Sequence, residues 1–161
     1  MHGATPAITE LLAAGVPFTE RAYAHDPRAS SYGWEAAEAL GRDADQVFKT
    51  LMVTGHHRSR DYAIGIVPVS TTLDLKKMAK AMTAKKLTLA PVAEAERISG
   101  YVAGGISPLG QRRHLPTIID ASAKEWATIL VSGGRRGLDI ELSPLDLAEL
   151  IGARFAPITE R

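Results

Sequence analysis

The fold of this chain is decided by two neighbouring stretches, Val47-Phe48-Lys49-Thr50-Leu51-Met52-Val53-Thr54 and Tyr62-Ala63-Ile64-Gly65-Ile66-Val67-Pro68-Val69. Both are rich in apolar and β-branched residues and have the length of ordinary strands. The segment between them, Gly55-His56-His57-Arg58-Ser59-Arg60-Asp61, contains only glycine and polar residues. We therefore expect a β-hairpin in which 47–54 pairs with 62–69 around this loop.

Helical and strand patterns alternate along the rest of the chain. Thr5-Pro6 and Ser143-Pro144 each combine a capping hydroxyl with a proline at the first helical position. Helices are expected over 6–14, 34–40, 73–82, 91–98, 123–126 and 144–151. Further strands are expected over 17–25, 86–90, 116–120, 127–131, 137–141 and 155–158.

The lengths of the connections decide the fold class. Most of them are too short for a strand–helix–strand crossover, which favours antiparallel pairing. We expect an α+β fold with one mixed, largely antiparallel curved sheet surrounded by helices. The chain has no repeat or linker, so residues 1–161 are expected to form a single domain.

The composition is that of an ordinary globular domain, with 161 residues, 45% hydrophobic content and a net charge of +1. No apolar run approaches the ~20 residues that a membrane helix needs, and residues 1–6 lack a signal-peptide pattern. We expect no membrane contact and a cytoplasmic location. The absence of cysteine excludes disulfides, thiolate metal sites and a cysteine nucleophile.

Lys49 interrupts a strand that is otherwise nearly all apolar. Strand alternation places it on the same face as Val47, Leu51 and Val53. Its ammonium could extend to solvent at the end of the strand. Alternatively, it projects into a pocket, where it could bind phosphate or carboxylate.

The segment 100–110, Gly-Tyr-Val-Ala-Gly-Gly-Ile-Ser-Pro-Leu-Gly, is too irregular for one helix or strand. Gly104 and Gly105 permit close approach of a ligand, and their N–H groups could bind an anion or oxyanion. A tight structural turn is the alternative. The segment matches neither a phosphate-binding P-loop nor a nucleophile elbow.

Residues 131–140, Val-Ser-Gly-Gly-Arg-Arg-Gly-Leu-Asp-Ile, are expected to form two strands joined by a Gly-Gly loop. Asp139 lies between Leu138 and Ile140, and a buried carboxylate there needs a cationic partner or ligand. Ser132 and Asp139 flank the same hairpin and are candidates for one cavity.

Basic residues concentrate in two places, and both could be solvated surface or contacts for a nucleic-acid backbone. The first contains Lys76, Lys77, Lys80, Lys85 and Lys86; the second is Arg112-Arg113-His114. The five histidines follow no metal-ligand spacing, so we expect no metal and no cofactor.

Several motifs together resemble the YbaK family across nearly the whole chain. Lys49 lies within Gln-Val-Phe-Lys-Thr-Leu (46–51), and two glycine-rich runs match, Gly-Gly-Ile-Ser-Pro-Leu-Gly-Gln (104–111) and Ser-Gly-Gly-Arg-Arg-Gly-Leu-Asp-Ile (132–140). Further matches are Tyr-Ala-His-Asp-Pro (23–27), Leu-Asp-Leu-Lys-Lys (73–77) and Leu-Pro-Thr-Ile-Ile-Asp (115–120). The resemblance is weakest at 30–35 and 55–61.

The resemblance implies a free-standing deacylase that removes cysteine from mischarged Cys-tRNA(Pro), related to the editing domain of bacterial prolyl-tRNA synthetases. Hydrolytic editing is needed because cysteine and proline differ too little in size for one binding step to separate them. In such enzymes no protein side chain attacks the ester. The thiol of the substrate closes on its own carbonyl carbon and releases a thiolactone.

The resemblance also implies the site and its partners. Lys49, Gly104 and Asp139 are the expected catalytic residues. The expected substrate-binding residues are Tyr23, Lys49, Gly104, Gly105, Ser132, Gly133 and Asp139. Lys76, Lys77, Lys80, Arg112 and Arg113 are candidates for contacts with the tRNA backbone. A transient complex with prolyl-tRNA synthetase is expected.

Two alternatives stay open at this stage. One is editing of Ala-tRNA(Pro) or another small mischarged aminoacyl-tRNA, with water as the nucleophile. The other is a module that binds tRNA or a synthetase without catalysis.

Overall fold

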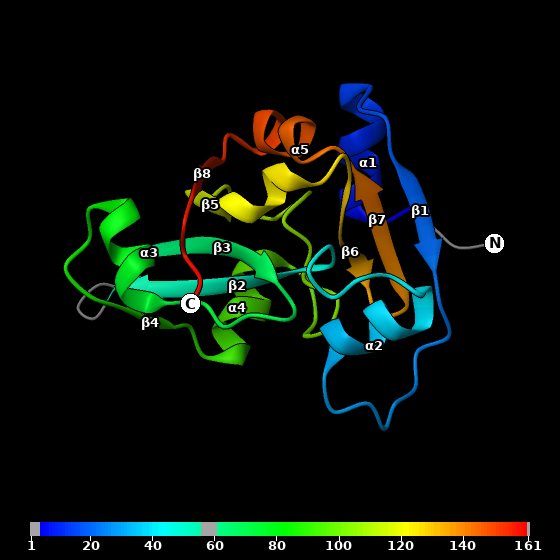
Figure 1. Ribbon diagram of the computed structural model, residues 1–161, viewed down its shortest axis with the longest axis horizontal. Helices are drawn as coiled ribbons and strands as arrows, with labels where there is room; N and C mark the ends of the chain where they lie inside the picture. The colour runs from blue at the N-terminus through cyan, green and yellow to red at the C-terminus, as the bar shows by residue number, and fades with distance from the viewer. Residues whose placement is uncertain (1–3, 56–60, 161) are drawn as a thin grey trace.

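The structure is a computed structural model that describes residues 4–55 and 61–160. The expected hairpin loop, except for Gly55 and Asp61, lies outside the described residues. Two β-sheets, five α-helices and one 3₁₀ helix are present in the described part of the chain (Figure 1). The expected α+β class is confirmed.

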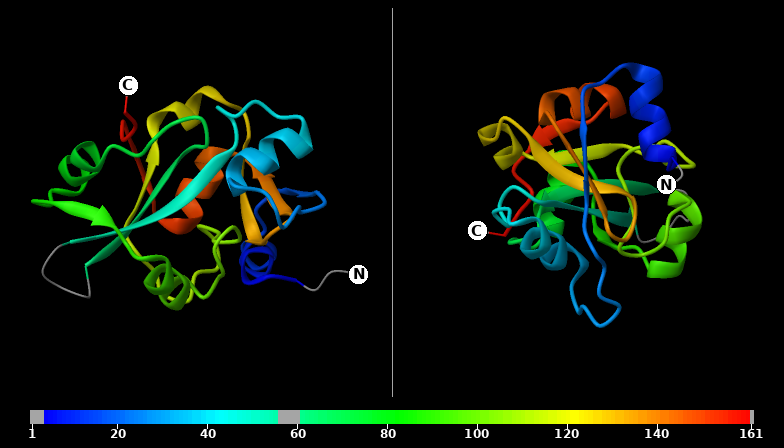
Figure 2. Two further views of the ribbon diagram at one scale, coloured as in Figure 1. Left: turned by 90° about the horizontal axis from the view of Figure 1, so that it is seen from below. Right: turned by 90° about the vertical axis from the view of Figure 1, so that its right-hand side faces the viewer.

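The expected single sheet is instead two sheets whose strands run in clearly different directions (Figure 2). One sheet has the order β1-β7-β6 and the other has the order β4-β2-β3-β5-β8. The first contains β1 (Thr19–Ala22), β6 (Ile129–Arg135) and β7 (Leu138–Leu142). The second contains β2 (Phe48–Gly55), β3 (Tyr62–Pro68), β4 (Leu87–Leu89), β5 (Thr117–Asp120) and β8 (Arg154–Ala156).

One parallel bridge, between Val47 and Leu130, joins the two sheets. The Leu130 N–H donates to the Gln46 carbonyl at 3.1 Å. Pairing within each sheet is antiparallel except for β3 with β5 and β5 with β8, which are parallel. The sheets are therefore mixed and largely antiparallel, as the connection lengths predict.

The β2–β3 hairpin has the expected pairing, from Phe48 opposite Pro68 to Thr54 opposite Tyr62. Its two faces pack into different clusters of apolar side chains. Phe48 and Met52 face the main cluster, whereas Val53 faces the cluster beneath α3 (Leu75–Met82). Alternation along the strand thus gives β2 two buried faces.

Local capping sets the ends of the helices. Thr5 Oγ1 accepts from the Ile8 N–H at the start of α1 (Pro6–Ala14), and Ser143 caps α5 (Pro144–Ile151), both as expected. α2 (Tyr32–Leu40) begins earlier than expected because Ser31 caps it. α3 begins later because Asp74 is its cap, and Leu73 instead forms a bridge with Thr159.

The remaining elements differ from expectation mainly at their ends. α4 (Val92–Ser99) follows Pro91, and the short helix expected over 123–126 is a 3₁₀ turn, η1 (Ala121–Glu125). β1 is shorter than 17–25, and β8 lies slightly N-terminal to 155–158. The Gly133-Gly134 pair is not the hairpin loop; it lies inside β6 at a register shift, and the turn is at Arg136-Gly137.

An ion-pair cluster links β1, the segment after α2 and the residue before β6 to Glu141 on β7. The Glu141 carboxylate accepts from the Arg42 guanidinium at 2.8 and 2.9 Å, from Arg21 at 2.8 Å and from the Thr128 hydroxyl at 2.6 Å. Chiefly because of the Arg42 hydrogen bonds, the pKa of Glu141 falls to about 2. No motif in the sequence predicts this cluster, because its members are distant along the chain.

The glycine-rich segment packs so closely against the rest of the protein that side chains do not fit. A Cβ on Gly105 would lie 2.7 Å from the Arg135 Cα, and one on Gly110 would lie 2.3 Å from the Pro6 carbonyl carbon. Gly110 also has a φ of +61°. These glycines therefore let the segment lie against β6 and α1.

We predict that Gly110→Ala destabilises the protein far more than Gly15→Ala does. Both residues have left-handed backbones, which cost a side-chain-bearing residue about 1–2 kcal/mol. Only Gly110 has an obstructed Cβ position, since nothing lies within 4 Å of the one built on Gly15. The additional steric cost at Gly110 should be about 2 kcal/mol, measurable by urea unfolding. Equal losses in the two variants would show that the close approach is relaxed without cost.

Candidate active site

A cavity of about 450 Å³ lies where the two sheets meet. Its walls come from the start of α2, from β2, from the segment around Gly104 and from the β6–β7 hairpin. The predicted residues Tyr23, Lys49, Gly104, Ser132 and Asp139 all line it. The structure therefore brings together side chains that are far apart in the sequence.

The bridge between the sheets explains this convergence. Val47 and Leu130 pair in parallel, so Lys49 and Ser132 each lie two residues beyond the bridge in the same direction. Ser132 is paired with Asp139 across the β6–β7 hairpin. Tyr23 directly follows β1, and its N–H donates to the Gly137 carbonyl at 2.9 Å.

Two other predicted residues, Gly105 and Gly133, do not line the cavity. Gly105 packs against the backbone of Arg135, and a Cβ on Gly133 would lie 2.7 Å from the Leu138 Cγ. Close packing explains why both residues are glycine. A role of either residue in substrate binding stays a prediction.

Lys49 and Asp139 place opposite charges on one cavity without pairing. Neither side chain makes a hydrogen bond or ion pair within residues 4–55 and 61–160. Burial lowers the pKa of Lys49. Burial raises the pKa of Asp139, which is only 5% exposed, to about 7. Burial thus disfavours the charged form of both groups, and a ligand of opposite charge would favour it again.

Tyr23 completes the polar side of the cavity. Burial, and next the negative charge of Asp139, raise the pKa of its phenol to about 12. The phenol is therefore a neutral hydrogen-bonding group at physiological pH. The Ser132 hydroxyl accepts a hydrogen bond from the Gly134 N–H at 3.2 Å.

The N–H groups around Gly104 are not equally available. The Ala103 N–H donates to Glu96 Oε2 at 2.7 Å, and the Gly105 N–H donates to the Val102 carbonyl at 2.8 Å. The Gly104 N–H makes no hydrogen bond to any described residue. The Gly104 backbone has a φ of +85° and lies against the ring of Tyr32. Of these three donors, only the Gly104 N–H remains for an oxyanion.

The opposite side of the cavity is apolar. Phe48, Met52, Ala90, Ala95 and Ile106 line it. These residues were not among the predicted site residues, because each one alone matches an ordinary core position. Two of them, Phe48 and Met52, lie near Lys49 because all three residues belong to β2, which lines the cavity.

The predicted basic contacts do not gather at this cavity. Lys76 and Lys80 are exposed on α3, and Lys77 Nζ donates to the Thr159 carbonyl at 2.8 Å. Arg112 donates to the Arg97 carbonyl at 3.4 Å. These residues lie outside the lining of the cavity.

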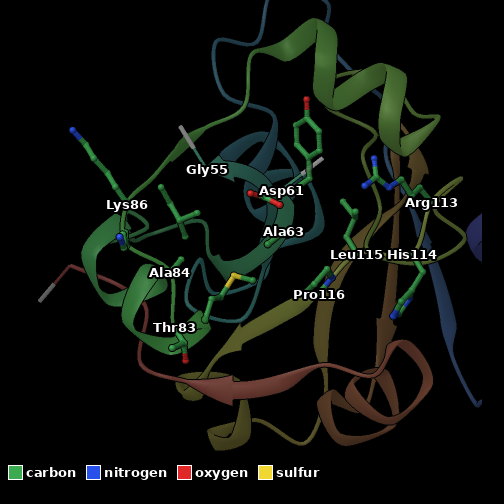
Figure 3. A pocket seen from close by; sticks show the side chains of 14 residues that line it. Gly55, Asp61, Ala63, Thr83, Ala84, Lys86, Arg113, His114, Leu115 and Pro116 are labelled. Atoms are coloured by element: carbon green, nitrogen blue, oxygen red, sulfur yellow. The ribbon is translucent and has the colours of Figure 1, made fainter. Parts of the chain in front are cut away.

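A second cavity of about 940 Å³ is lined by Lys85, Lys86, Arg113 and His114, among others (Figure 3). Arg113 lies over the Tyr62 ring at 5.8 Å. Lys86 lies on one side of this cavity, and Arg113 and His114 lie on the other (Figure 3). Its basic groups do not converge on one point, so the smaller cavity is the better candidate for chemistry.

The described residues contain neither a helix able to span a membrane nor a cluster of metal-binding side chains. None of the helices there combines the length and apolarity that crossing a membrane requires. Histidine and carboxylate side chains of the described ranges form no group of three or more with metal-binding geometry. His2, His56 and His57 lie outside these ranges, and the absence of a metal stays a prediction.

The sequence model of the aminoacyl-tRNA editing domain matches residues 27–150, so the chain belongs to this family. The resemblance to editing proteins seen in the motifs is therefore confirmed. The expected enzyme class, an aminoacyl-tRNA deacylase, is confirmed at the level of the family.

Among individual proteins, the chain is similar to EbsC of Enterococcus faecalis, which is named as a Cys-tRNA(Pro)/Cys-tRNA(Cys) deacylase. The two are 37% identical over 125 residues, which cover 78% of this chain and 75% of EbsC. A crystal structure described as a trans-editing enzyme for prolyl-tRNA synthetase matches with a TM-score of 0.80 and 23% identity, over 97% of this chain and 96% of that one. Hypothetical protein APE2540 matches with a TM-score of 0.84 and 23% identity, over 96% and 99%. The two structural matches establish the fold.

We predict that Asp139→Asn stabilises the protein at pH 8 and that this gain disappears in acid. Burial raises the pKa of Asp139 from its ordinary value of 3.8 to about 7, so the folded chain keeps this proton over a range in which the unfolded chain loses it. Stability is therefore present in acid and is lost as the pH rises from about 4 through 7. The difference corresponds to roughly 4 kcal/mol at most. Urea unfolding of both proteins between pH 4 and pH 8 measures it.

Glu141→Gln is the matched control on the same strand. Its carboxylate has a lowered pKa, so its contribution is present at neutral pH and is lost as the pH falls toward about 2. The variant should be less stable than the parent at pH 7, and the difference should shrink in acid. A loss of stability at pH 8 in both variants would contradict the interpretation of Asp139.

Proposed function

We propose that this chain is a trans-editing deacylase that removes cysteine from mischarged Cys-tRNA(Pro). The observation that carries the proposal is the cavity in which Lys49 and Asp139 lie unpaired beside the free Gly104 N–H. A volume of about 450 Å³ falls in the ordinary range for small-ligand sites. The name of EbsC supports the choice of cysteine.

The charged groups suggest how the end of the tRNA is held. The α-ammonium of the aminoacyl group pairs with Asp139, and its positive charge favours the ionised carboxylate. Lys49 binds the terminal phosphate or ribose. Tyr23 and Ser132 orient the ester by hydrogen bonds. The apolar side of the cavity, with Met52 and Ala95, accommodates the amino-acid side chain.

In the proposed reaction the substrate supplies its own nucleophile. The cysteine sulfur attacks the ester carbonyl carbon, and the developing oxyanion accepts a hydrogen bond from the Gly104 N–H. The bond between the carbonyl carbon and the ribose oxygen breaks, and the proton lost by the thiol ends on that oxygen. The products are a thiolactone and free tRNA. The protein contributes mainly by folding the thiol onto the carbonyl.

The partners follow from this substrate. Lys76, Lys77, Lys80, Arg112 and Arg113 remain candidates for contact with the tRNA backbone, outside the reacting cavity. We propose a transient complex with prolyl-tRNA synthetase as the source of mischarged tRNA, and a cytoplasmic location where translation occurs. We further propose that residues 1–161 act as one domain.

We predict that Lys49→Met lowers kcat/KM for deacylation by roughly 100-fold or more while the fold is retained. Methionine keeps the length and removes the charge, and the loss of a half-buried cation should not lower the free energy of unfolding. Lys124→Met, on η1, is the control for removing a lysine elsewhere. Near-normal turnover by Lys49→Met would indicate that the ammonium only extends to solvent.

The nature of the nucleophile is tested by comparing Cys-tRNA(Pro) with Ser-tRNA(Pro) in single-turnover deacylation. The two substrates differ at the sulfur, so thiol attack predicts that the cysteinyl ester reacts faster by at least roughly tenfold. Equal rates, or hydrolysis of Ala-tRNA(Pro) at the same rate, would instead favour attack by water. No cleavage in the presence of prolyl-tRNA synthetase would favour a binding module.

A further inference from the structure

Thr50 carries a buried hydroxyl that has no hydrogen-bond partner. Among the described residues, Thr50 Oγ1 is the only buried side-chain nitrogen or oxygen atom without a hydrogen-bond partner. Burying a hydroxyl without a partner typically costs about 1–3 kcal/mol. Thr50 also lines the candidate active site. An unpaired polar atom at such a position indicates a partner that arrives with the substrate.

The register of the β2–β3 hairpin places this hydroxyl on the apolar side of the cavity. Thr50 pairs with Ile66, between the pairs of Phe48 and Met52. Alternation directs all three of these β2 side chains to the same face, and Lys49 to the opposite one. Thr50 therefore shares a face of β2 with the apolar lining residues Phe48 and Met52, opposite to the face that carries Lys49.

The main chain of Thr50 also lies on the edge of β2 at a point where β4 does not pair with it. The Ala90 N–H donates to the Met52 carbonyl at 2.9 Å, so even-numbered residues of β2 direct their backbone groups away from β3. β4 covers this edge only from Val53 onward. The N–H and C=O of Thr50 therefore lie on an uncovered edge. Thr50 thus places a polar group between the apolar lining residues Phe48 and Met52.

We propose that Thr50 is a specificity residue that recognises the side-chain heteroatom of the aminoacyl group. Its hydroxyl accepts a hydrogen bond from the cysteine S–H, which selects cysteine over alanine and directs the sulfur toward the ester. A site built to hydrogen-bond a substrate group disfavours analogues that lack the group, because its own polar atom stays unpaired. This inference rests on the proposed function, since it assigns the side-chain subsite of the same cavity.

Binding of amide-linked analogues tests the proposal without catalysis. The probes are 3′-cysteinylamino-3′-deoxyadenosine and 3′-alanylamino-3′-deoxyadenosine, whose amide bonds resist cleavage. The parent should bind the cysteinyl probe roughly tenfold more tightly than the alanyl probe. Thr50→Val should abolish the preference by weakening only the cysteinyl complex, and Thr50→Ser should retain it. A preference that survives in Thr50→Val, or is absent in the parent, would overturn the proposal.

The free energy of unfolding provides a second test, because a purely structural role of Thr50 predicts a different result. Thr50→Val removes an unpaired hydroxyl, so its free energy of unfolding should equal or exceed that of the parent. Thr117→Val is the matched control, because the buried Thr117 hydroxyl donates to the Leu115 carbonyl at 3.0 Å. That variant should lose stability. A comparable loss in Thr50→Val would show that the hydroxyl has a partner within the protein.

The same measurements distinguish failure of the proposed function from failure of the Thr50 assignment. If the parent prefers the cysteinyl probe through Thr50 but does not cleave Cys-tRNA(Pro), the subsite is retained and the deacylase assignment fails. If the parent cleaves Cys-tRNA(Pro) and Thr50→Val does so at the same kcat/KM with the probe preference intact, only the assignment of Thr50 fails.

Discussion

The bridge between Val47 and Leu130 is the constraint on which the site depends. Within residues 4–55 and 61–160, it is the bridge that pairs the main chains of the two sheets. Because the bridge is parallel, β2 and β6 leave it in the same direction and then separate into different sheets. Lys49 and Ser132 are the first residues beyond it on the same side. The separation of the strands opens a cavity between them, and Asp139 enters through its pairing with Ser132.

One face of β7 carries two carboxylates with opposite electrostatic surroundings. Glu141 is surrounded by Arg42, Arg21 and Thr128, and its lowered pKa marks a group that favours folding at neutral pH. Asp139, two residues earlier, has no such partner, and burial raises its pKa. The cluster at Glu141 fixes β1 and the end of α2 to β7. The strand can then hold an unfavourable carboxyl group at the cavity without losing its position.

The sequence predicted what local chemistry controls and missed what distant segments decide. Capping by Thr5 and Ser143 and the pairing of the β2–β3 hairpin follow from neighbouring residues. The division into two sheets does not, because the bridge joins residues more than 80 positions apart. Gly133 and Gly134 matched a loop pattern, yet close packing against Leu138 and Tyr101 keeps them in a strand. The polar side of the cavity was predicted from motifs, and its apolar side and Thr50 were not.

A chain without cysteine is consistent with a reaction in which the thiol belongs to the substrate. The described lining of the cavity contains no histidine, and the Ser132 hydroxyl accepts from a neighbouring N–H rather than contacting a base. Under the proposed mechanism, the protein has to neutralise the charges of the substrate, orient it and enclose it. No protein side chain has to attack the ester. Unpaired charges, one free N–H and an unpaired hydroxyl suit that task, because each leaves a bond to be completed by the ligand. The polar groups whose burial costs folding energy are then the ones that bind the aminoacyl end.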